Sequence, residues 1–497
     1  MTMHYDIVVV GAGNAAFCAA LAAAESGKKV LVLERAPEEE SGGNSRYTAG
    51  LMRVAYRGVE DLKRVMPELS AAEIARSDFG TYTQEQFLDD MGRVTEYRCD
   101  PDLTEVLVRN SLSTVEWMRI KGVRFTAAWG RQAFNIGGKF KFWGGLTVEA
   151  VGGGPGLVES LTAIAKKSGI ELWYEARALE LLTDDAGVTG IFLRHKGTTK
   201  KLHAKAVVLA AGGFQADPEQ RVRYLGPGWE LAKVRGTRFN TGDGIRMALA
   251  AGAAAAGNWS GCHAVAWERN APEFGDLAVG DQFQKHSYPW GIYLNAEGRR
   301  FVDEGADFRN YTYARYGRVI LQQPGQFAWQ VFDAKVKAQL RDEYKIKQVT
   351  KRVGNTLEEL VSKLEDTNQE QALREIQDYN RAVQTEIPFN PNVKDGRCTK
   401  NLAINKSNWA NTLDTPPFEA YAVTCGITFS FGGLKINTEA QVISSDGAPI
   451  PGLYAAGELV GGIFWFNYPG GAGLTNGSVF GRIAGQNAAR AAGTRAA

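Results

Sequence analysis

Cysteine and histidine are scarce in this chain of 497 residues, which contains five of each. The cysteines stand far apart, and no two have the CxxC spacing; they are Cys18, Cys99, Cys262, Cys398 and Cys425. This distribution argues against zinc or iron–sulfur ligation and against a disulfide framework. We therefore expect reduced thiols and no bound metal.

Long apolar runs and a surplus of one charge are also missing. No apolar stretch reaches the roughly 18–20 residues that a membrane-spanning helix needs. The 57 lysines and arginines nearly balance the 55 aspartates and glutamates, so no basic surface for nucleic acid is indicated. The apolar start is interrupted by His4 and Asp6 and does not resemble a secretory signal. We expect a cytoplasmic protein without a nucleic-acid partner.

The first 34 residues have the order strand, glycine turn, helix, strand, acid. Residues 7–10 are short and β-branched, as in a buried parallel strand. Gly11 permits a tight turn, Gly13 lets the backbone approach a phosphate, and Ala16 stands where a third small residue allows close helix packing. Glu34 follows the second strand and could accept hydrogen bonds from ribose hydroxyls. The unit predicts dinucleotide binding, with the diphosphate at the helix N-terminus.

Distant segments favour FAD over NAD as the dinucleotide. Short strands that end in glycine recur at 207–213 and 450–458, and the segment Ser-Gly-Gly-Asn-Ser occupies 41–45. An FAD molecule laid across one domain needs such return visits of the chain. Glycine-turn strands at both ends predict a discontinuous nucleotide domain of the Rossmann-like α/β class. We place it at 1–260 and 416–497, around an inserted segment at 261–415.

These motifs resemble the flavoprotein subunits of the fumarate reductase and succinate dehydrogenase superfamily. The markers lie between residues 6 and 489: GAGNAA, GGNS, AAGGF, NTGDG, GRRFVDE, AAGE and FGRIAG. The resemblance implies a Rossmann-like FAD-binding domain, an inserted α+β capping domain, and an oxidoreductase acting on a CH–CH bond. Further segments resemble the FAD-dependent tricarballylate dehydrogenases: RGTRFNTGDG, GCHAV, RRFVDEGADFRNYTYARYG, QQPGQ and NYPGGAGL.

The resemblance also implies a set of contacts to FAD. The pyrophosphate and adenosine contacts are Gly11, Gly13, Asn14, Ala15, Glu34, Ala178, Ala211 and Gly212. The flavin-ring and ribityl contacts are Gly42, Gly43, Asn44, Ser45, Asp243, Glu458, Gly473 and Leu474. Members with covalent FAD carry a linking histidine where this chain has Tyr47. We therefore expect FAD bound without a covalent link.

For catalysis the resemblance points first to Arg309, which follows the RRFVDE segment. A guanidinium, with a pKa above about 12, is normally a poor acid or base. It can transfer a proton when carboxylates lower the cost, and Asp303, Glu304 and Asp307 are local candidates. The alternative is that Arg309 only clamps a substrate carboxylate in a two-pronged contact. His263, flanked by small residues, is a second catalytic candidate.

The expected substrate contacts include two departures from the fumarate and succinate enzymes. Phe429 and Tyr468 stand where those enzymes grip one carboxylate of a C4 diacid, so succinate and fumarate are not expected substrates. Lys285 and His286 lie where the superfamily has carboxylate contacts, and Ser430 follows Phe429. Tyr468 is a third catalytic candidate.

The resemblance implies oxidation of tricarballylate to cis-aconitate, by loss of a proton α to a carboxylate and hydride transfer to flavin N5. It also implies a membrane-bound iron–sulfur protein as electron acceptor. The first alternative is desaturation of a cyclic ketone, as in 3-ketosteroid dehydrogenases, because Tyr468 and nearby aromatics could line an apolar pocket. These aromatics are Trp129, Phe134, Phe140, Phe142, Trp143, Phe464, Trp465 and Phe466. The second alternative is a non-catalytic flavin-binding assembly subunit or redox sensor.

Overall fold

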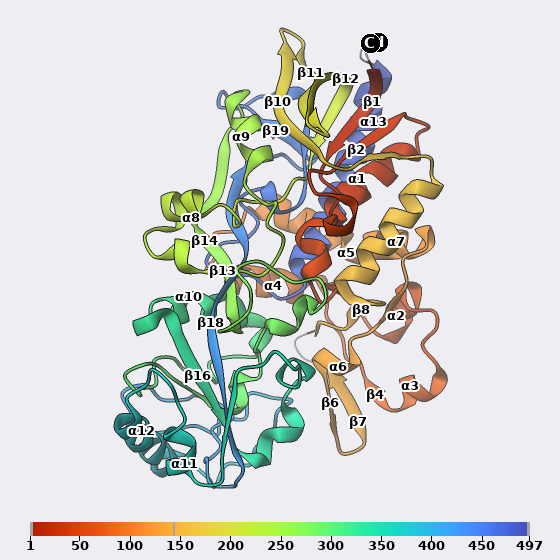
Figure 1. Ribbon diagram of the computed structural model, residues 1–497. Coiled ribbons are helices and arrows are strands. Elements are labelled where there is room, and N and C mark those ends of the chain that lie inside the picture. The colour runs from red at the N-terminus through yellow and green to blue at the C-terminus, as the bar shows by residue number, and fades with distance from the viewer. Residues whose placement is uncertain (1–2, 143–144, 495–497) are drawn as a thin grey trace.

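A largely parallel sheet forms the upper part of the molecule in Figure 1. The computed structural model describes residues 3–142 and 145–494. Five parallel strands of this 8-stranded sheet are, in spatial order, β20 (Pro449–Ala455), β12 (Thr198–Leu209), β1 (Met3–Val10), β2 (Val30–Leu33) and β9 (Glu171–Trp173). The antiparallel strands β10 (Ala176–Asp184), β11 (Gly187–His195) and β19 (Gln441–Ile443) extend it. The apolar run of β1 is buried, as expected for a strand covered on both faces.

Two helices from opposite ends of the chain pack against each other beside this sheet. They are α1 (Asn14–Ala24) and α13 (Ala472–Thr494). Their contact depends on glycine, because a Cβ added at Gly481 would lie 2.4 Å from the carbonyl oxygen of Ala15. A Cβ at Gly485 would lie 2.1 Å from the carbonyl oxygen of Ala19. The FGRIAG segment is therefore part of the close helix packing.

A second, 6-stranded sheet is built around the long strand β18 (Phe418–Leu434), which runs down the molecule in Figure 1. Its partners are β14 (Ala255–Glu268), β16 (Phe327–Phe332), β17 (Lys351–Gly354) and β13 (Lys233–Val234), and β15 (Ile292–Leu294) pairs with β16. The division of the chain into domains stays a prediction. The boundary placed at 260/261 falls inside β14, because this strand continues through both segments.

Further elements surround the two sheets. The helices are α2 (Val59–Val65), α3 (Ala71–Ala75), α4 (Gln84–Val94), α5 (Pro101–Lys121), α6 (Trp129–Gln132), α7 (Gly153–Lys167), α8 (Pro218–Leu225), α9 (Asp243–Ala250), α10 (Tyr313–Leu321), α11 (Leu357–Val361) and α12 (Gln369–Ala382). Two small sheets contain β3 (Leu51–Met52), β8 (Val148–Ala150) and β5 (Phe125–Ala127), and β4 (Ser77–Asp78), β7 (Lys139–Phe142) and β6 (Ala133–Ile136).

Within residues 3–142 and 145–494, none of the helices combines the length and the apolarity required to cross a bilayer. The same residues contain no cluster of three or more histidine, cysteine, aspartate and glutamate side chains suited to a metal ion.

Candidate functional site

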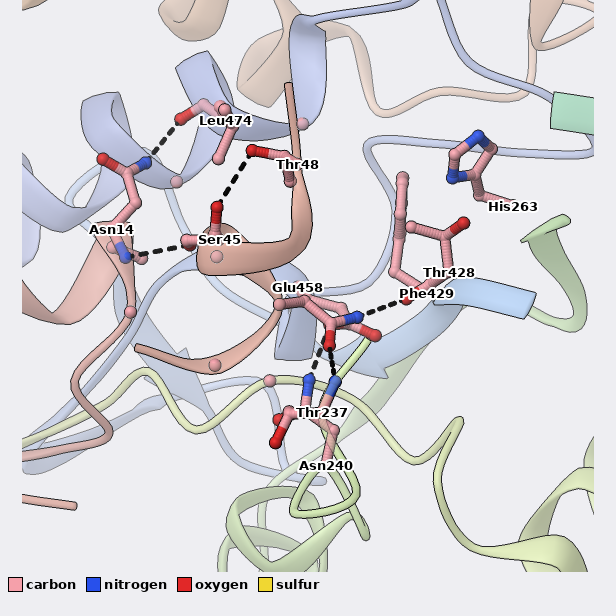
Figure 2. Close-up of a pocket in the computed structure, with 18 of the residues that line it drawn as sticks. Asn14, Ser45, Thr48, Thr237, Asn240, His263, Thr428, Phe429, Glu458 and Leu474 are labelled. Atoms are coloured by element: carbon pink, nitrogen blue, oxygen red, sulfur yellow. Dashed lines mark hydrogen bonds between the residues drawn. The ribbon is translucent and has the colours of Figure 1, made fainter. Parts of the chain in front are cut away.

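One pocket takes its lining from the ends of both sheets. Val10, Glu34 and Ala210 line it at the carboxyl ends of strands in the larger sheet, and His263 and Phe429 line it from the second sheet. Ligands of open α/β sheets bind outside the carboxyl ends of parallel strands, so this is the expected place for a dinucleotide. In Figure 2, His263 lies on the opposite side of the pocket from Asn14.

The pocket gathers the residues that the sequence assigned to FAD. Every one of them lines it except Gly42. A Cβ added at Gly42 would instead lie 2.7 Å from Cγ1 of Val158, which shows that this residue packs against α7. The individual contacts to FAD stay predictions, but the residues lie together as the motifs required.

The turn after β1 is built for a phosphate group. Gly11 has a φ of +108°, and a Cβ there would lie 2.4 Å from the carbonyl oxygen of Ala210.

The carboxylate of Glu34 accepts hydrogen bonds from the backbone N–H of Ala12 at 3.0 Å and of Ala36 at 2.8 Å. Each oxygen of Glu34 keeps acceptor capacity for a ribose hydroxyl. Burial raises the pKa of Glu34 from its ordinary value, and the backbone donors offset part of that shift.

Three distant segments meet at the start of α1. The backbone N–H of Asn14 donates to Oγ of Ser45 at 3.0 Å, and its side-chain Nδ2 donates to the carbonyl oxygen of Leu474 at 2.8 Å (Figure 2). The N-termini of α1 and α13 therefore both border the pocket. Free N–H groups and helix dipoles favour negative charge at these positions, which suits a diphosphate and a reduced flavin.

The side chain of Asn44 connects the segment 41–45, which carries predicted flavin contacts, to the second sheet. Its Nδ2 donates to the carbonyl oxygen of Thr428 at 2.5 Å, and its Oδ1 accepts from the backbone N–H of Thr237 at 2.9 Å. Asn44 therefore fixes the position of the loop that carries Gly43 and Ser45.

The two carboxylates assigned to the ribityl chain lie in different surroundings. Glu458 accepts from the backbone N–H of Ser430 at 3.0 Å and from Nε2 of Gln215 at 3.3 Å. Burial raises the pKa of Glu458 to about 7. Asp243 is instead held in ion pairs by Arg35 at 3.0 Å and Arg177 at 2.8 Å.

This ion pairing changes the expectation for Asp243. Arg35 follows Glu34, and Arg177 precedes Ala178, both of which were assigned to adenosine. The acid at the start of α9 therefore lies beside the predicted adenosine contacts rather than with Glu458. The contact of Asp243 with the ribityl chain stays a prediction.

Tyr47 faces away from the pocket. Its side chain is buried, and a Cβ added at Gly275 would lie 2.6 Å from its ring. The ring thus packs on the loop around Gly275 rather than toward the flavin segment, which supports FAD held without a covalent bond.

At the other end of the pocket, His263 lies in an irregular part of β14. The pairing register between β14 and β18 shifts on both sides of Cys262 and His263, and such bulges redirect side chains. The His263 ring centroid lies 5.0 Å from that of Tyr313, 5.1 Å from Phe429 and 4.8 Å from Tyr468. Burial lowers the pKa of His263 well below its ordinary value, so the ring is neutral at pH 7.

His286 and two tyrosines surround the same space. The ring centroid of His286 lies 4.9 Å from that of Tyr313. Burial, and to a smaller extent the positive charge of Arg309, lowers the pKa of His286 well below its ordinary value. The hydroxyls of Tyr313 and Tyr468 form a short hydrogen bond with each other. Burial raises the pKa of both phenols, so they remain protonated donors at neutral pH.

Arg309 lines the pocket, but the carboxylates expected to assist it are bound elsewhere. Glu304 pairs with Arg300 at 2.5 Å, Asp307 pairs with Arg93 at 2.6 Å, and Asp303 accepts hydrogen bonds from Ser407. Burial lowers the pKa of Arg309, and the negative charge of Glu343 offsets part of this shift. The RRFVDE segment thus has a structural role through its ion pairs.

The side chain of Lys285, a predicted substrate contact, does not line the pocket. It is fully buried, and its Nζ donates to the carbonyl oxygens of Gln282 at 3.1 Å, Phe283 at 3.3 Å and Gln284 at 3.2 Å. Burial lowers its pKa to about 8. The ammonium group stabilises a turn of the chain and is not presented to a substrate. His286, Phe429 and Ser430 do line the pocket.

The pocket contains polar residues that the sequence did not single out. Arg235 donates twice to Asp281, at 2.6 and 2.9 Å, and Arg131 donates to the same carboxylate at 3.3 Å. Tyr313 is the partner of Tyr468. Arg235 and Tyr313 lie inside the quoted RGTRF and NYTYARYG segments, so the signal was present, whereas Arg131 lies in no recognised motif.

Most of the predicted aromatic lining lies elsewhere. Phe464 and Tyr468 line the pocket. Trp129 packs on Phe140 and on Phe142, Phe134 packs on Trp290, and Phe466 is exposed. Trp143 lies outside the described residues. The pocket is therefore less apolar than the aromatic set suggested.

Comparisons with known proteins assign the chain to a family. The FAD binding domain family matches residues 6–474, so the chain belongs to this family. A probable fumarate reductase of Shewanella frigidimarina is 29% identical, over 98% of this chain and 75% of its own length. 4-Oxocyclohexanecarboxylate 2-dehydrogenase of Sinomonas cyclohexanicum is 28% identical, over 99% of this chain and 95% of its own length. The solved structure of a flavocytochrome c3 fumarate reductase in an open conformation matches with a TM-score of 0.72 at 28% identity, covering 99% of this chain and 79% of that chain.

The family membership confirms the predicted fold class, cofactor and enzyme class. The protein is a mixed α/β flavoprotein of the fumarate reductase and succinate dehydrogenase superfamily, with an FAD-binding domain and a capping domain. Its cofactor is FAD, and it is an oxidoreductase of the class that acts on carbon–carbon bonds. A non-catalytic subunit does not fit this membership.

Proposed function

We propose that the protein catalyses FAD-dependent α,β-dehydrogenation of a small polycarboxylate, with oxidation of tricarballylate to cis-aconitate as the first candidate. The supporting observation is the charge of the substrate end of the pocket. Arg131, Arg235 and Arg309 line it together with one carboxylate, that of Asp281, so two positive charges are in excess among the described residues there. His263 and His286 are neutral and do not add to this charge.

In the proposed reaction the substrate loses a proton from the carbon α to a carboxylate and a hydride from the neighbouring carbon. Bound FAD would supply the oxidising power by accepting the hydride at N5. Negative charge develops on the carboxylate as the α proton leaves, and the guanidinium of Arg309 stabilises that charge. Arg309 is also the candidate for moving the proton, and binding of the carboxylate alone is its alternative role.

Electrons must then leave the protein. We propose a separate redox protein as the acceptor, and a membrane-bound iron–sulfur protein is the candidate that the resemblance to tricarballylate dehydrogenases supplies.

A second candidate is a cyclic ketone or cyclic keto acid. The observation in its favour is the hydroxyl pair of Tyr313 and Tyr468 beside the rings of Phe429 and Phe464. One phenol donates to the other, so the second could donate to an enolate oxygen while the aromatic rings contact the ring carbons of the substrate. The similarity to 4-oxocyclohexanecarboxylate 2-dehydrogenase, over nearly the full length of both chains, supports this candidate.

Anaerobic bleaching of the flavin absorbance tests both candidates. The substrates are tricarballylate, succinate, 4-oxocyclohexanecarboxylate and a 3-ketosteroid. We expect tricarballylate to bleach the flavin and succinate to fail, because Phe429 and Tyr468 replace the usual grip on a C4 diacid. Bleaching by a ketone alone would replace the first candidate with the second. Rapid bleaching by succinate would refute the substrate reasoning as a whole.

A further inference from the structure

Arg131 enters the pocket from a part of the chain without a recognised substrate motif. It lies on the short helix α6, directly before the hairpin of β6 and β7. Two arginines hold this helix in place. Arg309 donates to the carbonyl oxygen of Arg131, and Arg341 donates to the carbonyl oxygen of Gly130 at 2.7 Å. The backbone of α6 is therefore fixed next to the predicted catalytic arginine.

The guanidinium of Arg131 makes fewer hydrogen bonds within the protein than that of Arg235. Arg235 uses Nε and Nη2 on Asp281 and Nη1 on Thr428, the last at 3.2 Å. Arg131 uses Nη1 on Asp281 at 3.3 Å, the one hydrogen bond of its guanidinium seen in the described part of the chain. Its side chain is 29% exposed and lines the pocket. A guanidinium has five N–H donors, so Arg131 can form a two-pronged contact with a carboxylate.

The guanidinium of Arg131 is positively charged at neutral pH. Burial alone would lower the pKa of its guanidinium, but the carboxylates of Asp281, Glu343 and Glu149 raise it above its ordinary value. Phe429 and Tyr468 occupy the positions where related enzymes grip a second carboxylate, and neither side chain carries a positive charge. Among the described residues at this end, positive charge beyond Arg309 and Arg235 comes from Arg131, and each nitrogen of Arg235 already donates one hydrogen bond within the protein.

We propose that Arg131 binds the second carboxylate of the substrate and thereby selects di- and tricarboxylates over monocarboxylates. This inference rests on the proposed function, because it assumes a substrate with more than one carboxylate. Arg309 binds or acts on one carboxylate, and Arg131, its direct neighbour, binds the next. The specificity of the site is thus supplied by α6 rather than by β18.

The test compares ligand binding by the FAD-loaded protein and by its variant Arg131→Gln. Binding of tricarballylate, glutarate and butyrate is measured by isothermal titration calorimetry on the dithionite-reduced protein, because reduced FAD cannot accept a hydride and the bound acid is therefore not oxidised. Glutamine retains hydrogen bonding but removes the charge and the two-pronged geometry. We expect tricarballylate and glutarate to bind about 10- to 100-fold more weakly to the variant, and butyrate to change less than about twofold.

Arg76→Gln is the matched control. Arg76 lies close to Trp129, the first residue of α6, with its guanidinium 5.6 Å from the indole ring, but it does not line the pocket. The control should bind all three acids as the unaltered protein does and should retain the same FAD content.

Binding and turnover separate the two proposals. If the unaltered protein binds tricarballylate selectively without oxidising it, the proposed reaction fails while the assignment of Arg131 stands. If the Arg131→Gln substitution weakens the binding of all three acids equally, or of none of them, the assignment is overturned. Equal affinity of the unaltered protein for butyrate and tricarballylate would also overturn it.

Discussion

Replacing Asp281 with asparagine should destabilise the protein strongly, because this carboxylate neutralises a buried arginine. Asp281 accepts hydrogen bonds from Arg235 Nε and Nη2, from Arg131 Nη1 and from Gln284 Nε2. Both Arg235 and Asp281 are buried, with side-chain exposures of 7% and 3%. Asparagine would retain one acceptor oxygen but would turn an N–H₂ group toward donors that cannot accept.

The expected loss in the free energy of unfolding is about 3–5 kcal/mol, the usual cost of leaving a buried charge without its partner. Urea denaturation, monitored by far-UV circular dichroism of the FAD-loaded protein, measures this loss. Asp342→Asn is the control, because Asp342 is 81% exposed and pairs with Lys345 at the surface, where ion pairs contribute little.

A double variant sharpens the test. Arg235→Met combined with Asp281→Leu removes both charges and should cost less than Asp281→Asn alone, because the buried charge of Arg235 is no longer present without its partner; Arg131, which also loses Asp281, is 29% exposed and can be solvated. A loss below about 1 kcal/mol for Asp281→Asn would refute the reasoning, since it would mean that Arg235 is solvated or finds another partner. A double variant more damaging than the single one would show that packing, rather than charge, sets the cost.

Three further predictions follow from the site. Acid precipitation should release all FAD into the supernatant, because Tyr47 packs away from the pocket; yellow colour that stays with the polypeptide would contradict this. Arg309→Lys should abolish turnover and leave FAD bound, because lysine keeps the charge but loses the two-pronged geometry; a retained maximal rate with weaker substrate binding would make Arg309 a clamp. The FAD-free protein should lose stability as pH rises from about 4.5 to about 7, because burial raises the pKa of Glu458 to about 7 and the folded state then binds more protons than the unfolded state. Glu458→Gln should flatten this part of the pH profile in urea titrations, and an unchanged profile would remove Glu458 as its cause.

The nucleotide half of the site could be predicted from the sequence because its determinants are local. A strand, a turn and a helix start fix where Gly11, Gly13 and Asn14 stand relative to one another, and the structure brings Ser45 and Leu474 to the same place. These segments depend on backbone geometry, which glycine positions reveal. The meeting of α1 and α13 was visible only through motifs at both ends of the chain.

The substrate half was less predictable because it depends on side-chain direction and long-range contacts. Lys285 and His286 are adjacent, yet one side chain binds backbone carbonyls and the other faces the pocket. Spacing alone cannot decide between them. Arg131 comes from a separate helix whose placement depends on contacts with Arg309 and Arg341. No local pattern around residue 131 indicates this.

The contact between α1 and α13 has a consequence for synthesis of the protein on the ribosome. The glycine turn and α1 are translated well before α13, against which α1 packs. Domains generally fold as units once their parts are available. The face of α1 that contacts α13 therefore stays uncovered until α13 has been translated. The pocket, which the N-termini of α1 and α13 both border, is complete only after α13 has been made.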